Sequence, residues 1–216
     1  MNRLILMSLG VMAISACNTN PFLEEWKGEY AFPPFDKIKT SDYVPAVKAG
    51  IKQQSDEINA IVSNNEAPTF ANTIAAYELS GETLSKVLGV LYNVSESDAT
   101  PEMQTIMDEV TPLVTESTDN IFMNKAFFER VKAVYADSSS LDREQYMVTK
   151  KLYSRFIDNG VALADNEQVR FKEINAELAS LSQKFGNNLL AENNAFKETI
   201  GIPVSSYPVF MTTCDD

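Results

Sequence analysis

Residues 171–196 read FKEINAELASLSQKFGNNLLAENNAF, and this stretch decides the fold class. Its apolar residues recur at spacings of three, four or seven: Phe171, Ile174, Leu178, Leu181, Phe185, Leu189 and Phe196. Such spacings return to one face of an α-helix, here for about seven turns. The stretch therefore predicts one long helix over most of residues 166–197, with the apolar stripe as its core face and Leu181 near the middle.

Shorter runs with the same spacing precede it. The first begins after Ser41, the expected N-cap, and comprises Val44, Val47, Ile51, Ile58 and Ile61. Three more runs follow: Phe70, Ile74, Tyr77, Leu84, Leu88 and Leu91; Met103, Ile106, Val110, Val114 and Ile121; and Phe128, Val131 and Tyr135. No run alternates with the period of two typical of a half-buried strand. The sequence predicts an all-α fold, an array of antiparallel helices with an extended N-terminal arm.

Cap residues mark several helix ends. Thr100-Pro101-Glu102 predicts a helix start, because proline suits the first helical position and an acid suits the positive end of the helix dipole. Asn124 is expected to cap a short helix. The spacings Asp142-x-x-Gln145 and Asp165-x-x-Gln168 predict two capping boxes, each opening a further helix.

Two residues inside the runs need an interpretation of their own. Gly81 keeps the phase of its run, so we interpret it as a point of close contact within one continuous helix. Pro112 lies inside a helical run, where it removes one backbone donor and should bend the helix.

The ends of the chain differ from this helical domain, which we place at residues 41–200. Residues 17–40 contain Pro21, Pro33 and Pro34 and lack helical spacing, which indicates an extended arm. Its aromatic residues are expected to pack on the helices, with the lining of a peptide channel as the alternative; they are Trp26, Tyr30, Phe32 and Phe35. Residues 201–216 form an irregular, divergent tail.

Residues 1–16 have the features of a lipoprotein signal peptide. Arg3 precedes an apolar run from Leu4 to Ile14 that is too short to span a bilayer, and Ser15-Ala16-Cys17 ends it. This pattern predicts cleavage before Cys17 and acylation of its thiol, giving a membrane-anchored lipoprotein that faces the periplasm or the cell surface. An ordinary signal peptide or a chance cysteine is the alternative.

Charge and cysteine content exclude several classes of partner and stabilisation. The chain has 18 basic and 30 acidic residues, a net charge of −12, which disfavours nucleic acid and anionic lipid. Attachment to a membrane would therefore depend on the acyl chains. Once Cys17 is acylated, Cys214 is the only remaining thiol, so no intramolecular disulfide can form.

The residue types limit the chemistry that this chain can perform. It has no histidine, which excludes a Ser-His-Asp triad, a Cys-His pair and imidazole ligation of zinc. Its carboxylate clusters are expected to be solvated surface without a calcium motif; they are Glu24-Glu25, Glu116 with Asp119, and Asp215-Asp216. We therefore predict no catalytic residue, metal ligand or cofactor site in the chain.

Short blocks of sequence carry a family resemblance across residues 20–199. They are NPFLEEW (20–26), PPFDKIK (33–39), DYVPA (42–46), FANTI (70–74), SGETL (80–84), TESTDNI (115–121) and FGNNLLAE (185–192). In number and order these blocks resemble the amino-terminal half of the zinc peptidyl-dipeptidases, the family of oligopeptidase A and thimet oligopeptidase.

The resemblance implies a division of labour. In that family the amino-terminal helices wall one side of a deep channel for oligopeptides and pack against a catalytic half, which supplies the zinc ligands and the catalytic glutamate. Residues 1–216 contain no H-E-x-x-H sequence, so the resemblance implies a truncated, lipid-anchored metallopeptidase that is inactive alone and exposes apolar side chains. The alternative is a genuine short paralogue, a non-enzymatic helical scaffold or binding module. The oligomeric state stays open.

Overall fold

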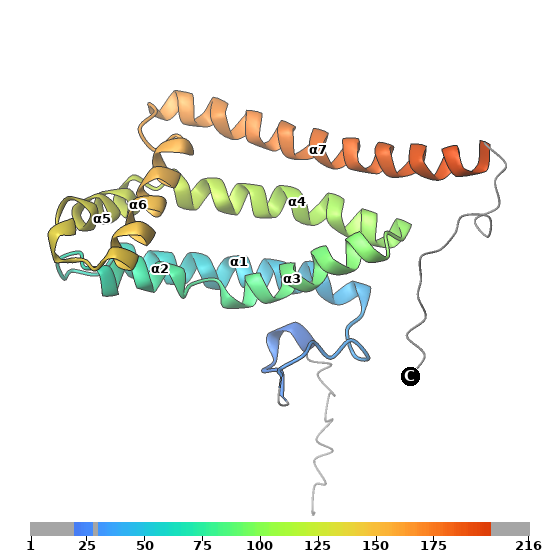
Figure 1. The fold of residues 1–216 in the computed structure, drawn as a ribbon, viewed down its shortest axis with the longest axis horizontal. Coiled ribbons are helices and arrows are strands. Elements are labelled where there is room, and N and C mark those ends of the chain that lie inside the picture. Colours follow the sequence, from blue (N-terminus) through green and yellow to red (C-terminus); the bar gives the residue numbers. More distant parts are fainter. Residues whose placement is uncertain (1–19, 28–29, 200–216) are drawn as a thin grey trace, which may run out of the picture.

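The computed structural model describes residues 20–27 and 30–199, and within them the chain is all-α without a strand (Figure 1). The main helices are α1 (Thr40–Val62), α3 (Glu82–Ser97), α4 (Pro101–Phe122), α5 (Lys125–Ala136), α6 (Arg143–Asp158) and α7 (Asp165–Thr199). The shorter pieces are 3-10 turns at Pro21–Leu23 and Ser138–Ser140, a π-helical turn at Phe70–Ala75, and the single-turn α2 (Ala76–Glu78). The predicted fold class is confirmed.

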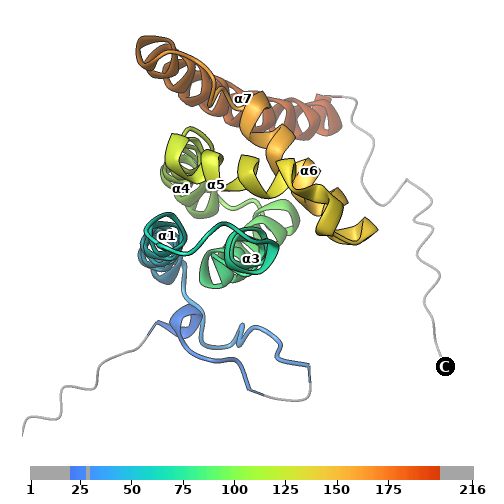
Figure 2. The same ribbon diagram turned by 90° about the vertical axis from the view of Figure 1, so that its left-hand side faces the viewer.

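The long helices are stacked in layers. α1 packs side by side with α3, α4 packs on α1, and α7 lies over α4 as the outermost layer, while α5 and α6 close one end (Figures 1 and 2). None of the helices in the described ranges is long and apolar enough to cross a membrane.

One hydrophobic core, the aromatic end, lies where α5 and α6 meet α4. Phe122, Phe127 and Phe156 are fully or almost fully buried there. The Phe156 ring meets the other two nearly edge-on, at centroid distances of 5.1 and 5.2 Å. Edge-to-face pairs of this kind add to the gain from burial. The aromatic end thus joins three helices in one rigid cluster.

A second core, the arm end, lies between α1, α3 and α4. It contains Val47 from α1, Leu91 from α3 and Val110 from α4, all fully buried. Phe22 from the arm completes this core and contacts the Tyr43 ring at 5.1 Å. The apolar runs predicted for these helices therefore do face a core.

The arm packs on the helices through its first residues and again through Ile38 near its end. Trp26 lies against Phe22 and donates its ring N–H to the Pro21 carbonyl at 3.0 Å. In contrast, Tyr30, Phe32 and Phe35 are exposed. The prediction that the aromatic residues anchor the arm is right for Trp26 and wrong for these three: the Tyr30 and Phe32 rings pack on each other at 5.7 Å, and Phe35 is 60% exposed.

The two glycines nearest the α1–α3 contact have different roles. A Cβ at Gly50 would lie 2.8 Å from the Leu84 Cα, so Gly50 permits the close approach of α1 and α3. Gly81 has a positive φ of 72° and immediately precedes α3. The interpretation of one continuous helix through Gly81 is therefore wrong: the chain turns there, and the Gly81 N–H donates to Glu57.

Most of the predicted caps are confirmed. The Thr100 hydroxyl accepts from the Met103 N–H, and Asn124 and Asp142 accept from the third residue of their helices. The Asp142 box is closed by Gln145. α4 runs through Pro112 as one helix, and a bend there stays a prediction.

Two predicted caps are wrong. α1 begins at Thr40, ahead of Ser41, because the Asp42 carboxylate accepts from the Lys39 N–H and so satisfies an earlier donor. At the start of α7 the Glu167 carboxylate accepts from the Ala164 N–H. Gln168 instead donates to the carbonyls that follow α6, so Asp165 and Gln168 form no box.

Arg130 of α5 ties down the connection that follows α1. Its guanidinium donates to the Asn64 carbonyl at 2.8 Å, the Glu66 carbonyl at 3.3 Å and the Asn72 side chain at 3.3 Å. A single side chain thus holds both ends of the loop between α1 and the π-helical turn.

α7 has the predicted extent but not the predicted orientation. It spans Asp165–Thr199 and packs on α4, yet none of its described side chains is buried. Ile174, Leu178, Leu181, Phe185 and Leu189 are between 40% and 69% exposed. The prediction that this stripe faces the core is wrong, whereas the expectation of exposed apolar side chains from the family resemblance is met. The side chain of Phe196 lies outside the described part.

Candidate functional site

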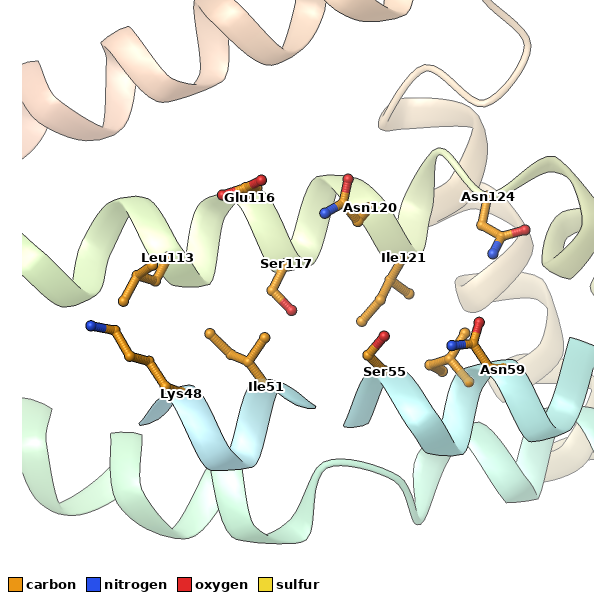
Figure 3. Close-up of a pocket in the computed structure, with 11 residues that line it drawn as sticks. Lys48, Ile51, Ser55, Asn59, Leu113, Glu116, Ser117, Asn120, Ile121 and Asn124 are labelled. Atoms are coloured by element: carbon orange, nitrogen blue, oxygen red, sulfur yellow. The ribbon is translucent and has the colours of Figure 1, made fainter. Parts of the chain in front are cut away.

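A groove of about 450 Å³ runs between α1 and α4 (Figure 3). α1 contributes Lys48, Ile51, Ser55, Ile58 and Asn59, and α4 with its following residues contributes Leu113, Glu116, Ser117, Asn120, Ile121 and Asn124. Small side chains such as Ser55 and Ser117 face this space from the two helices.

The lining residues follow the i, i+4 rows of both helices. Ile51, Ser55 and Asn59 form the row on α1, and Figure 3 shows Ser117 and Ile121 pointing across toward it from α4. The α4 row alternates apolar and polar side chains, and the α1 row has one apolar residue followed by two polar ones, so apolar and polar side chains are mixed along the groove.

Charged and capping groups mark the ends of the groove. At one end the Lys48 ammonium pairs with the Glu109 carboxylate of α4 at 2.9 Å. At the other end the Asn124 side chain accepts from the Phe127 N–H and so is committed to capping α5. Neither group is therefore available as an unpaired charge or amide oxygen.

The groove offers hydrogen bonds rather than reactive groups. The side chains of Ser55, Asn59 and Ser117 make no hydrogen bond within residues 20–27 and 30–199. Hydroxyl and amide groups both donate and accept, which suits the N–H and C=O groups of an extended peptide. No histidine stands beside either serine hydroxyl, because the sequence has none. The arrangement offers hydrogen-bond donors and acceptors on both sides of the groove.

Glu116 and Asp119, a cluster considered from the sequence, are not brought together. Glu116 is exposed at the rim of the groove, whereas Asp119 is only 4% exposed at the junction of α4 with α7. Burial raises the pKa of Asp119, while a 2.8 Å hydrogen bond from Asn175 and the charge of Lys172 oppose the rise. Asp119 therefore serves the packing of α7.

The other sequence candidates do not form a site either. Glu24 and Glu25 are exposed on the arm, where the Glu24 carbonyl accepts from Lys86 at 2.9 Å. Cys17, Cys214 and Asp215-Asp216 lie outside the described residues. Nowhere in the described part do three histidine, cysteine, aspartate or glutamate side chains gather as metal ligands would.

Sequence reasoning did not find the groove. The signal was present: Ser55 and Asn59 continue the row of Ile51 on α1, and Ser117 stands between Leu113 and Ile121 on α4. Small polar residues in line with core positions indicate a hollow beside the core, but only the packing of α1 on α4 brings the two rows together.

Comparison with known proteins gives the context of this site. No family model matches the chain. It is 35% identical over 180 residues to dipeptidyl carboxypeptidase of Salmonella typhimurium and 34% identical over 178 residues to that of Escherichia coli, in each case over 82% of this chain. Organellar oligopeptidase A of Arabidopsis thaliana is 25% identical over 93% of the chain. The homologues of this chain are peptidases.

The match covers only part of those homologues. The chain spans about a quarter, 26%, of the length of each of these three relatives, in their amino-terminal part. Such peptidases usually bind zinc. The side chains of this chain do not fit that metal, because the sequence has no histidine and the described residues form no cluster of metal ligands.

Proposed function

We propose that this chain is the amino-terminal helical portion of a lipid-anchored zinc peptidase that cleaves oligopeptides, and that it is inactive alone. In this proposal the chain shapes and binds the substrate path, and residues outside it supply the metal and the reaction. The observation that carries the proposal is the similarity at 34–35% identity along 82% of the chain to dipeptidyl carboxypeptidases.

The groove between α1 and α4 is the part of the chain best suited to an oligopeptide. A peptide backbone presents one donor and one acceptor per residue, and Ser55, Asn59 and Ser117 present unpaired groups of both kinds. Apolar side chains such as Ile51 and Ile121 line the same groove and could contact the side chains of a peptide. We assign the chain a substrate-contacting role on these grounds.

The lipid anchor is the second part of the proposal. The sequence Ser15-Ala16-Cys17 after an apolar run supports cleavage before Cys17 and acylation of its thiol, with the helical body on the periplasmic side or at the cell surface. Mass spectrometry of the mature amino terminus should find a diacylglyceryl cysteine. Unchanged membrane fractionation of Cys17→Ser would contradict the anchor without touching the peptidase proposal.

Reconstitution tests the peptidase proposal directly. The whole chain is mixed with the part of Escherichia coli dipeptidyl carboxypeptidase that follows the matched quarter, and cleavage of a short peptide is measured with and without zinc. Neither piece alone should cleave, and the mixture should cleave in a zinc-dependent way. Cleavage by this chain alone, abolished by chelation and restored by zinc, would refute the proposal, as would an inactive mixture in which the two pieces co-elute.

Variants of the groove sharpen this experiment. Asn59→Ala removes one hydrogen-bonding side chain and should raise KM about fivefold with little change in kcat, because the lost contact holds ground state and transition state alike. Lys150→Ala on the exposed surface of α6 is the matched control and should leave both constants unchanged. Equal effects of the two substitutions would remove the groove from the substrate path.

A non-enzymatic scaffold or binding module is the second candidate. The exposed apolar side chains of α7 favour it, because large apolar groups exposed together indicate a surface that binds another protein. A protein that melts sharply and binds a hydrophobic dye, but associates with no peptidase part in reconstitution, would support this scaffold instead of a peptidase fragment.

A further inference from the structure

Three tyrosine rings, the tyrosine stack, lie parallel between α5 and α6. Tyr135 of α5 is within 17° of the planes of Tyr146 and Tyr153 of α6, at ring-centroid distances of 6.1 and 4.6 Å. Tyr146 and Tyr153 are two turns apart on α6, about 10.5 Å along its axis, so the Tyr135 ring fits between them. In the part of the chain that the structure describes, these are the only contacts between two tyrosine rings.

The core beside it holds the tyrosine stack in place. The Tyr153 ring contacts Phe128 of α5 at 5.4 Å, and Phe128 contacts the fully buried Phe156 of α6 at 5.6 Å. All three tyrosines are themselves partly buried. The stack is therefore one edge of the aromatic end, and α5 and α6 cannot slide along each other without breaking it.

Within the stack, the hydroxyl groups of Tyr135 and Tyr146 lie together. The Tyr146 side chain raises the pKa of the Tyr135 phenol, first through a hydrogen bond and then through its charge, and Tyr153 has a smaller effect of the same sign. A hydrogen bond between two phenols brings together the ring carbons next to their hydroxyls. Tyr135 and Tyr146 thus meet at the edges where phenols react with each other.

One-electron oxidation makes these ring carbons reactive. A tyrosine that loses an electron and its hydroxyl proton becomes a phenoxyl radical, and part of the unpaired spin lies on the carbons next to the oxygen. Two such radicals couple through these carbons when their rings are close. Because the fold already holds the Tyr135 and Tyr146 rings side by side, coupling needs no search between distant parts of the chain.

We propose that Tyr135 and Tyr146 form an intramolecular dityrosine cross-link when hydrogen peroxide and a haem peroxidase oxidise them. Each phenol gives up one electron and one proton, and together these reduce one molecule of peroxide to two of water. The two radicals form one carbon–carbon bond, and the hydrogen on each joined carbon moves to the phenolic oxygen. The product has lost two hydrogen atoms and joins α5 covalently to α6. The proposal is independent of the peptidase and of the lipid anchor.

Peptide mapping tests the cross-link, because trypsin separates the tyrosines of the stack. Tyr135, Tyr146 and Tyr153 fall on the tryptic peptides 133–143, 144–150 and 152–155. The whole chain is treated with peroxide and a haem peroxidase and digested, and mass spectrometry should find the first two peptides joined with the loss of two hydrogen atoms. The blue fluorescence of dityrosine should appear with the same time course.

Tyrosine-to-phenylalanine variants test which rings react. Tyr146→Phe keeps the ring but removes the hydroxyl, so it should abolish the joined peptide. Tyr153→Phe should retain it, because that ring only stacks on Tyr135. Tyr92→Phe, which changes an exposed tyrosine of α3, is the matched control and should also retain it. Circular dichroism of each variant separates a lost cross-link from a lost fold.

The same reaction in urea tests whether the folded stack matters. Unfolding separates the rings, so the yield of the joined peptide should fall several-fold. Three outcomes overturn the proposal: an equal yield in urea, a bond from peptide 133–143 to peptide 152–155 in place of 144–150, or dityrosine found only between separate chains. Absence of the joined peptide from a sample in which Met147, 43% exposed on α6, is oxidised also overturns it, since the oxidant then reached this helix.

Discussion

α4 and α7 are both long helices with an apolar stripe at spacings of three and four. α4 buries its apolar face, whereas α7 turns its polar face inward and leaves the apolar face exposed. Met103, Ile106 and Val110 of α4 are at most 8% exposed, whereas Leu178 and Leu181 of α7 are more than half exposed. Both stripes look alike in sequence. The difference shows that apolar periodicity identifies a face of a helix without telling whether this part of the chain covers it.

Polar partners decide which side of α7 lies inward. Lys172 donates to the Asn120 side chain at 2.6 Å, and Asn175 donates to Asp119 at 2.8 Å. Below these contacts two hollows of about 410 and 370 Å³ remain along the α4–α7 contact. α7 is therefore held by a few hydrogen bonds over a loosely packed surface, unlike α4, which is held by a filled core.

The largest expected difference comes from placing one charge in each stripe. Val110→Asp buries an unpaired carboxylate and should lower the free energy of unfolding by about 4 kcal/mol or more. Leu181→Asp should change it by less than about 0.5 kcal/mol at concentrations too low for association. Urea denaturation followed by circular dichroism measures both. Equal losses in the two variants would show that α7 buries its stripe in solution.

A methyl group added at a glycine compares the close α1–α3 contact with the loosely packed α7. Gly50→Ala forces a Cβ against the Leu84 backbone, so it should destabilise by about 2 kcal/mol. Urea denaturation of the purified variant tests this loss. A stability unchanged by Gly50→Ala would mean that α1 and α3 can separate without cost.

The same change in α7 should have the opposite sign. A Cβ at Gly186 would meet no atom within 4 Å, so Gly186→Ala should stabilise α7 by up to about 1 kcal/mol through helix propensity alone. Amide hydrogen exchange should slow within α7 and stay the same within α4. Faster exchange in the variant would indicate a close neighbour of Gly186.

The smallest effect is a pH dependence at the α4–α7 junction. Burial raises the pKa of Asp119, so the folded protein binds this proton more tightly than the unfolded chain does. Its contribution to stability therefore falls as pH rises from below the ordinary aspartate range through the raised pKa, and Asp119→Asn removes that fall. Urea denaturation from about pH 3 to pH 7 should show that the free energy of unfolding of the variant increases relative to that of the wild type as pH rises. Asp108→Asn, an exposed site on α4, should retain the wild-type profile.

Local signals in the sequence predicted much of the fold. The long helix and the caps at Thr100, Asn124 and Asp142 depend on residues within a few positions of each other, and all four are confirmed. Comparison with relatives adds that the chain matches about a quarter, 26%, of the length of a peptidase. The spacing of apolar residues alone does not show this.

What the sequence did not predict depends on contacts between distant segments. Gly81 kept the helical phase, yet the chain turns there because the Glu57 carboxylate of α1 accepts its N–H. The groove required α1 and α4 to bring Ser55 and Ser117 together, and the orientation of α7 required Asp119 to meet Asn175. None of these partners is a neighbour in sequence.

The three hydrogen bonds of Arg130 bear on the order in which the chain can assemble. During synthesis α1 and α3 emerge first, but the loop between α1 and the π-helical turn gains its anchor only when a residue 58 to 66 positions later arrives. Closing so long a segment costs conformational entropy before any contact offsets it. A nascent chain that stops before α5 should thus remain open to proteases at residues 64–69, and the shortest self-supporting unit of this protein extends at least through Arg130.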